Sequence, residues 1–161
     1  MNIIKRISFL FLFISIAYML SYAKVYLQSE SYYDFALESE HSNNLIEALK
    51  GVDKLELRQG ESYYGGYQQV IESWENSSFA PKPSIYYRAL EKPSIILNEM
   101  SDDVLKSFVE LYIELDNKYV MDAVLIMHAR ASAQNDMDEV ERTAQLLNEA
   151  FNYQTLTEDS K

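Results

Sequence analysis

Two histidines and a few spaced carboxylates are the residues of this chain best suited to chemistry. Glu38-Ser39-Glu40-His41 has the E-x-x-H spacing that places two metal ligands on one helix face in di-iron bundles. Those bundles use a second such motif, and no Glu stands three residues before His128, the other histidine. We therefore interpret His41 as a solvated surface residue and expect no metal ion and no cofactor.

His128 and Ser132 are four residues apart, a spacing at which side chains on a helix are neighbours. A hydrolase also needs an acid that orients the histidine and an oxyanion site, and the sequence presents neither. We interpret His128 as a buried structural histidine. Glu110 and Glu114 lie opposite the apolar stripe of their expected helix, which indicates a solvated face. The chain is therefore predicted not to be an enzyme, with no catalytic residue.

Tyrosines are better candidates for a binding surface. Eleven of them follow Ala23, and six of these stand in three doublets. Adjacent residues cannot both face one core, so some rings are expected at the surface, where Tyr is enriched in binding sites. The alternative is that each doublet joins core and rim with its hydroxyls in water. The candidate partner-binding residues are Tyr32, Tyr33, Tyr63, Tyr64, Tyr67, Tyr86 and Tyr87.

The first 23 residues have the three parts of an export signal. Lys5 and Arg6 are followed by the uncharged run Ile7–Leu20 and by Ser21-Tyr22-Ala23, which has small residues where a signal peptidase reads them. Cleavage there would make Lys24 the first residue of the mature protein. The alternative is an uncleaved anchor, because residues 7–23 are just long enough to span a bilayer. Both readings place the remaining chain outside the cytoplasm, periplasmic or secreted.

Composition narrows the partner class. The chain of 161 residues has 14 Lys+Arg and 25 Asp+Glu, and residues 24–161 carry a net charge of −13. Such a chain repels nucleic acid and favours a protein or peptide partner with a basic patch. Cysteine is absent, which excludes disulfides, Cys-ligated zinc and thiol catalysis. Membrane contact is expected only through residues 7–23, if they are retained.

Three apolar patterns in the last third predict a helical core. Residues 119–133 are apolar at nearly every angle of a helix, which indicates a central helix with neighbours on several sides. A helix over 104–115 is expected to bury one stripe of side chains: Val104, Phe108, Leu111, Tyr112 and Leu115. A helix over 137–151, with a capping box at Asp136 and Glu139, is expected to bury another: Met137, Val140, Ala144, Leu147 and Phe151.

The earlier part of the chain is expected to contain shorter helices. Residues 26–37 have helical spacing, and LIEALK is typical of a short helix ended by Gly51. Residues 52–59 fit a further helical turn or a short strand, and we expect the helical turn. An amphipathic helix is expected from Tyr67, followed by a loop over 76–84. The next helix, from Ile85, is expected to stop at Pro93.

Asp136-Met137-Asp138-Glu139-Val140, with Ala131 before and Ala144 and Leu147 after, resembles the turn and second helix of a tetratricopeptide repeat. The resemblance covers about residues 121–154, with no second copy one period earlier, and it implies paired antiparallel helices. The expected architecture is all-α: a single domain over residues 24–154, built as a small bundle or helix-hairpin array, after a signal or anchor (1–23) and before a flexible tail (155–161).

Three functions are compatible with these features. The first is an exported, non-enzymatic binding protein of the cell envelope, such as an immunity-like, inhibitor-like or assembly accessory protein. The second is an accessory subunit of an envelope complex, anchored by a single membrane pass. The third is an enzyme without a recognisable motif.

Overall fold

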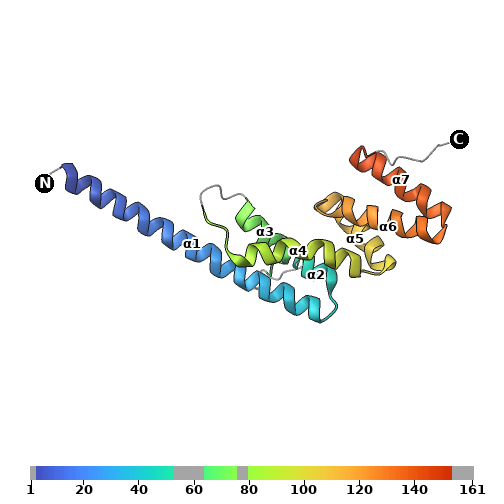
Figure 1. Cartoon of the computed structure of the whole chain (residues 1–161), viewed down its shortest axis with the longest axis horizontal. Coiled ribbons are helices and arrows are strands. Elements are labelled where there is room, and N and C mark those ends of the chain that lie inside the picture. Colours follow the sequence, from blue (N-terminus) through green and yellow to red (C-terminus); the bar gives the residue numbers. More distant parts are fainter. Residues whose placement is uncertain (1–2, 53–63, 76–79, 154–161) are drawn as a thin grey trace. The chain divides into compact units, whose positions relative to one another are not determined.

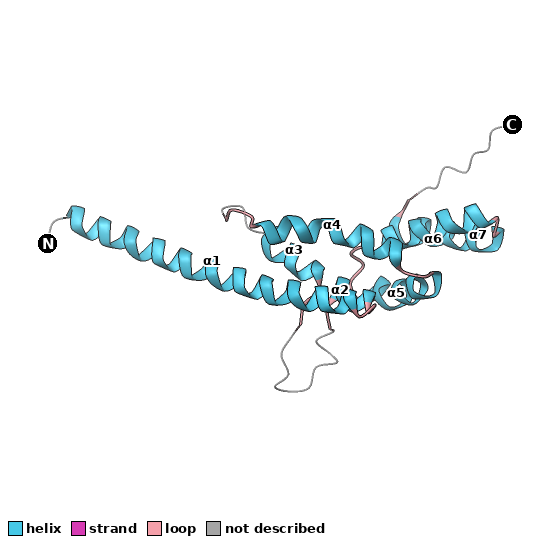
Figure 2. Cartoon of the chain, turned by 60° about the horizontal axis from the view of Figure 1, so that its bottom comes forward, coloured by secondary structure: helices cyan, strands magenta, loops and turns pink. Residues whose placement is uncertain are grey.

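A computed structural model describes residues 3–52, 64–75 and 80–153, and every regular element within them is a helix, which confirms the all-α prediction (Figures 1 and 2). The chain forms two compact units, residues 1–92 and 93–161. The helices are α1 (Ile3–His41), α2 (Leu45–Lys50), α3 (Tyr67–Glu75), α4 (Ser84–Glu99), α5 (Asp102–Leu115), α6 (Val120–Gln134) and α7 (Met137–Phe151). Residues 53–59 of the helical turn expected over 52–59, and the tail at 155–161, lie outside the described residues.

Helix α1 is continuous through Ala23, the expected end of the export signal. Its N-terminal part is long and apolar enough to cross a membrane, and none of that stretch is buried in the protein. Its C-terminal part packs on α2 and α3 and buries Tyr32, Tyr33 and Ala36. One helix therefore combines a largely exposed apolar segment with an amphipathic segment that belongs to the core of the first unit.

Close backbone packing joins α2 to the start of α3. Gly51 ends α2 with a φ of +74°, a conformation that favours glycine, as the sequence predicted. A Cβ atom on Gly66 would lie 2.6 Å from the carbonyl oxygen of Ala48 and 2.6 Å from the nitrogen of Gly51. Beside them, the Val52 N–H donates to the Tyr64 carbonyl over 2.9 Å. Glycines are therefore required where these two helices meet.

The prediction that Pro93 stops its helix is wrong, because α4 continues to Glu99. Proline removes one backbone hydrogen bond from a helix interior. The residues beyond it offset that loss, since Ile96 and Leu97 on α4 and Met100 just after it are almost completely buried. Pro93 also marks the division between the two compact units.

The second unit confirms the three predicted helices to within two residues at each end. Helix α6 packs against both α5 and α7, so it is the central helix of this unit. It buries one broad face, whereas Ala129 and Ala133 on the opposite side are exposed. The buried face consists of Val120, Ala123, Val124, Met127 and Ala131.

The predicted buried stripe of α5 is partly wrong. Leu105 and Val109 are buried beside Phe108, while Leu111 and Leu115 are 51% and 57% exposed. Apolar residues occupy so many positions of α5 that two overlapping stripes satisfy helical spacing, and contact with α6 selects one of them. In α7, Leu147 is buried as expected, but Met137 is exposed and Thr143 takes a buried position.

Candidate partner-binding site

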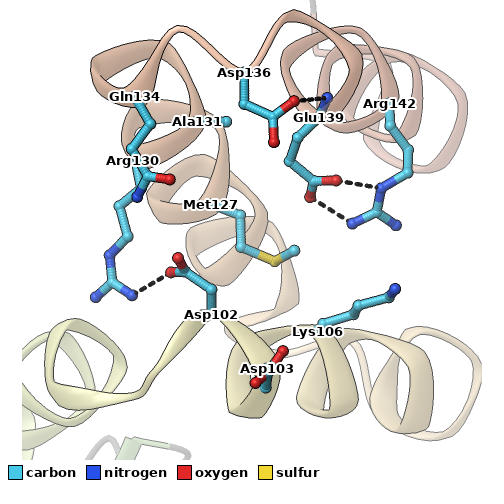
Figure 3. Close-up of a pocket in the computed structure, with 10 residues that line it drawn as sticks. All are labelled: Asp102, Asp103, Lys106, Met127, Arg130, Ala131, Gln134, Asp136, Glu139 and Arg142. Carbon is cyan, nitrogen blue, oxygen red and sulfur yellow. Dashed lines mark hydrogen bonds and ion pairs between the residues drawn. The ribbon is translucent and has the colours of Figure 1, made fainter.

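A pocket of about 210 Å³ lies where α5, α6 and α7 of the second unit meet (Figure 3). Two of its edges are helix N-termini and one is a helix C-terminus, so short polar caps and charged first-turn residues are gathered around one opening. The lining residues are Asp102, Asp103, Lys106, Met127, Arg130, Ala131, Gln134, Asp136, Glu139 and Arg142. Met127 extends from α6 into this space and is buried.

Arg130 fixes one wall of the pocket. Its Nη1 donates to Asp102 Oδ1 over 2.7 Å and to the Met100 carbonyl over 2.8 Å, and its Nη2 donates to the Asn98 carbonyl over 2.8 Å. These carbonyls belong to the end of α4, where the last turn of a helix leaves acceptors without backbone partners. Arg130 is therefore held in place by three acceptors, and Ser101, whose hydroxyl accepts from the Val104 N–H, caps α5 beside it.

The opposite wall is the first turn of α7. Asp136 accepts a hydrogen bond from the Glu139 N–H over 3.2 Å, which confirms it as the helix cap. Glu139 does not complete the predicted capping box. Its carboxylate instead accepts from Arg142 Nε and Nη2 over 2.8 and 2.5 Å, and these bonds hold the pKa of Glu139 below its usual range.

The pocket lining has four carboxylates and three basic side chains, Lys106, Arg130 and Arg142, so its net charge is −1. Asp102 and Glu139 each pair with an arginine, whereas Asp103 is exposed at the pocket and Asp136 keeps a second carboxylate oxygen beyond its cap bond. The second unit as a whole has 14 acidic and five basic residues, a net charge of −9, compared with −4 for residues 24–92. The pocket can therefore receive a cationic group over an apolar floor formed by Met127.

The Ser132 hydroxyl donates to the backbone carbonyl of His128 and not to its imidazole ring. The imidazole Nδ1 lies 2.9 Å from Thr143 Oγ1 on α7, and the Thr143 hydroxyl donates to the Glu139 carbonyl. Because that hydroxyl proton is already used, Nδ1 carries the hydrogen of the His128–Thr143 bond. His128 is half-buried and joins α6 to α7, while His41 is exposed at the end of α1.

The candidate tyrosines divide into two groups. Tyr64 and Tyr87 are 43% and 57% exposed, so their rings are accessible to a partner. Tyr63 lies outside the described residues. The remaining four are in the core of the first unit, with exposures of 8% or less: Tyr32, Tyr33, Tyr67 and Tyr86. The two accessible rings belong to different clusters, since Tyr64 stacks on Phe35 and Tyr87 packs edge-on against Tyr86.

A polar cluster in the first unit was not anticipated from the sequence. The carboxylate of Glu40 on α1 accepts from Lys92 Nζ of α4 over 2.6 and 2.8 Å and from the Tyr67 hydroxyl of α3 over 2.5 Å. Partial burial raises the pKa of Glu40, but the bonds from Lys92 and Tyr67 outweigh it and bring the net value below the ordinary range. The pKa of Tyr67 is raised by burial and by the neighbouring carboxylate of Glu40.

The sequence contains little that predicts this cluster. Glu40, Tyr67 and Lys92 are separated by 27 and 25 positions, and each taken alone reads as an ordinary surface or core residue. Only the tertiary packing of α1, α3 and α4 brings their polar atoms together. The cluster connects three helices of the first unit, which is the role of a structural ion pair.

Comparison with known proteins gives no relative from which a function could be carried over. No family model matches the chain, no curated protein matches it in sequence, and no solved structure matches it in fold. Within the described residues, no group of three or more metal-ligating side chains could hold a metal ion.

Proposed function

We propose that this chain is an exported, non-enzymatic protein that binds a basic partner protein or peptide outside the cytoplasm. The observation that carries the proposal is the net charge of −9 on the second unit, together with a pocket whose apolar floor lies beside the exposed residues Asp103 and Asp136. Immunity-like, inhibitor-like and assembly accessory proteins of the cell envelope are members of this class.

The pocket suits a lysine or arginine side chain of the partner. Its aliphatic stem would lie along Met127, and its charged end would reach Asp103 and the outer oxygen of Asp136. Opposite charges that meet across an interface guide association and set specificity. Asp102 and Glu139, which are paired with arginines, would keep the two walls of the pocket in place.

Export is supported by the N-terminal helix. Lys5 and Arg6 precede an apolar surface on which Phe9 is 72% and Leu20 is 67% exposed. An apolar surface of this size is unfavourable in water, so it is either removed by cleavage or covered by a bilayer. In both cases the basic end stays in the cytoplasm and the folded units are outside. An anchored accessory subunit, the second candidate function, is favoured by the packing of Tyr22 on Trp74.

Co-purification of the full chain from its native envelope tests the binding proposal. We expect a partner to be retained at low salt and released at high salt, because ions screen exposed charges. Asp103→Lys should abolish retention, whereas Glu149→Lys, an equal charge change outside the pocket lining, should preserve most of it. Equal loss in both variants would show that overall charge, and not this pocket, is responsible.

A reporter enzyme fused after Lys161 tests export separately. A reporter that requires the environment outside the cytoplasm should be active, and one that requires the cytoplasm should be inactive. The opposite pattern would refute export without bearing on the pocket.

A further inference from the structure

The end of the apolar segment of α1 is built into the first unit. The ring of Tyr22 packs edge-on against Trp74, with 5.3 Å between centroids and an interplanar angle of 61°. The Tyr22 hydroxyl donates to the Pro81 carbonyl over 3.3 Å, and Trp74 Nε1 donates to Ser29 Oγ over 2.9 Å. Cleavage after Ala23 would remove Tyr22 and leave the almost completely buried Trp74 uncovered on one side.

An apolar pocket of about 140 Å³ lies at this junction. One wall consists of Tyr18, Ser21, Tyr22 and Val25 of α1, and Ser73 and Trp74 of α3 form the other. Tyr18 is 45% exposed and belongs to the same helix surface as the exposed apolar side chains before it. The pocket is therefore continuous with the surface that a bilayer would cover.

The length of the apolar segment places this junction close to a membrane surface. Residues 7–23 form about 25 Å of helix at 1.5 Å per residue, somewhat less than the roughly 30 Å hydrocarbon core of a bilayer. A short span draws its flanking residues toward the bilayer. Lys5 and Arg6 can extend to the headgroups on one side, and Tyr and Trp favour the interface on the other.

Charge at the junction agrees with this placement. Lys24 follows the apolar segment directly. Lys82 follows Pro81, whose carbonyl accepts the hydrogen bond from the Tyr22 hydroxyl. Both lysines are exposed, although residues 24–161 as a whole carry a net charge of −13. Basic residues next to a membrane span are attracted to anionic lipid headgroups.

We propose that α1 is a retained transmembrane anchor, and that the pocket between Tyr18 and Trp74 holds a phospholipid acyl chain and seats the first unit on the outer face of the membrane. This inference goes beyond partner binding and does not depend on it. A bound lipid chain would cover the apolar wall of α1 where the helix enters the folded unit.

Trp74 is the only tryptophan of the chain, so its fluorescence reports this junction alone. The full-length protein is reconstituted in vesicles of phosphatidylcholine and phosphatidylglycerol that carry a nitroxide either near the headgroup end of the acyl chain or at its terminal methyl. We expect quenching by the shallow label to be about twofold stronger than by the deep label. Absence of quenching by both labels would overturn the proposal.

A matched pair of variants tests the pocket itself. Tyr18→Glu places a charge on the pocket wall and should reduce shallow quenching by at least about half. Tyr87→Glu changes another exposed tyrosine of the first unit and should leave quenching unchanged. Circular dichroism of both variants confirms that the helices are retained. Equal quenching in the two variants would contradict a lipid in this pocket.

A separate measurement tests whether α1 is retained in the mature protein. Intact mass and N-terminal sequencing of the protein from its native cells should give a chain that begins at residue 1 or 2 and stays in the membrane pellet after a carbonate wash. A soluble chain that begins at Lys24 would refute the anchor, while the co-purification experiment would still decide partner binding.

Discussion

At the scale of single residues, Glu40 is the best-defined polar centre of the first unit. Its carboxylate has two strong donors, and its side chain is 16% exposed, compared with 21% for that of Lys92. A carboxylate with hydrogen bonds to a lysine and a tyrosine is stabilised in its charged form. The pKa of Glu40 is therefore lower in the folded state than in the unfolded chain, with a direct consequence for stability.

We predict that Glu40→Gln removes part of the acid sensitivity of the first unit. A lowered folded pKa gives stability that is fully present above the unfolded value of about 4.3 and is lost as pH falls through the folded value. Urea unfolding followed by Trp74 fluorescence should show that the variant is less stable than the wild type at pH 7. The gap should narrow at lower pH, and a gap that is constant with pH would contradict the assignment.

His128 belongs to the residue scale as well. The sequence indicated a structural histidine, and its bond to Thr143 agrees with that role, although Ser132 was the partner considered from spacing. Spacing along one helix cannot reveal a partner on the next helix. Thr143 was missed because it occupies a buried position where an apolar residue is expected.

At the scale of elements, two leucines of α5 test which face of this helix is buried, because each can be replaced by alanine. Leu105 is completely buried and Leu111 is 51% exposed, and both lie in the same helix. Leu105→Ala should destabilise the second unit by about 2–5 kcal/mol, because it removes packed methyl groups and leaves a cavity. Leu111→Ala should change stability by only about 0.5 kcal/mol.

Thermal unfolding followed by circular dichroism measures this difference. Equal effects of the two substitutions would contradict the burial of Leu105 alone. A larger effect of Leu111→Ala would show that α5 turns the other of its two apolar stripes toward α6.

The junction of α2 and α3 provides a second element-scale prediction. Gly66→Ala should destabilise the first unit by about 1–3 kcal/mol, because its methyl group would meet the backbone of Ala48 and Gly51. Ser94→Ala, at an exposed position of α4, is the control and should change stability by about 0.5 kcal/mol at most. Unfolding monitored through Trp74 fluorescence would contradict this packing if Gly66→Ala were as stable as the wild type.

These elements also show how far the sequence predicts the fold. The helices α5, α6 and α7 were predicted because each has a long apolar pattern, which is a local signal, and α7 also has a polar cap at Asp136. The path of α4 through Pro93 was not predicted, because the burial of Ile96 and Leu97 that offsets the proline is a tertiary effect. The α5 face was ambiguous for the same reason.

The candidate site was less predictable than the fold. Tyrosine doublets indicated a surface role, but three of their five described members, Tyr32, Tyr33 and Tyr86, lie in the core of the first unit. The acidic pocket of the second unit is formed by three helix ends that are distant in sequence. From the sequence, Asp136 and Glu139 are recognised only as the capping box of a helix.

At the scale of the whole molecule, the two units differ in charge. The second unit has a net charge of −9, and the first unit contains the apolar helix and the aromatic junction beside it. These properties support separate tasks, attachment at the membrane by the first unit and capture of a basic partner by the second. We expect each proposed task to be lost through a substitution that leaves the other unit unchanged.

Site-specific photo-crosslinking in the native cells tests the central claim, partner binding at the acidic pocket, most directly. A photoreactive residue replaces Gln134, an exposed member of the pocket lining, and in a control chain it replaces Glu149, which lies outside the lining. We predict one discrete protein adduct from position 134, little from position 149, and loss of the adduct when Asp103→Lys is added. No adduct from position 134, or the same adduct from both positions, would contradict the proposed function.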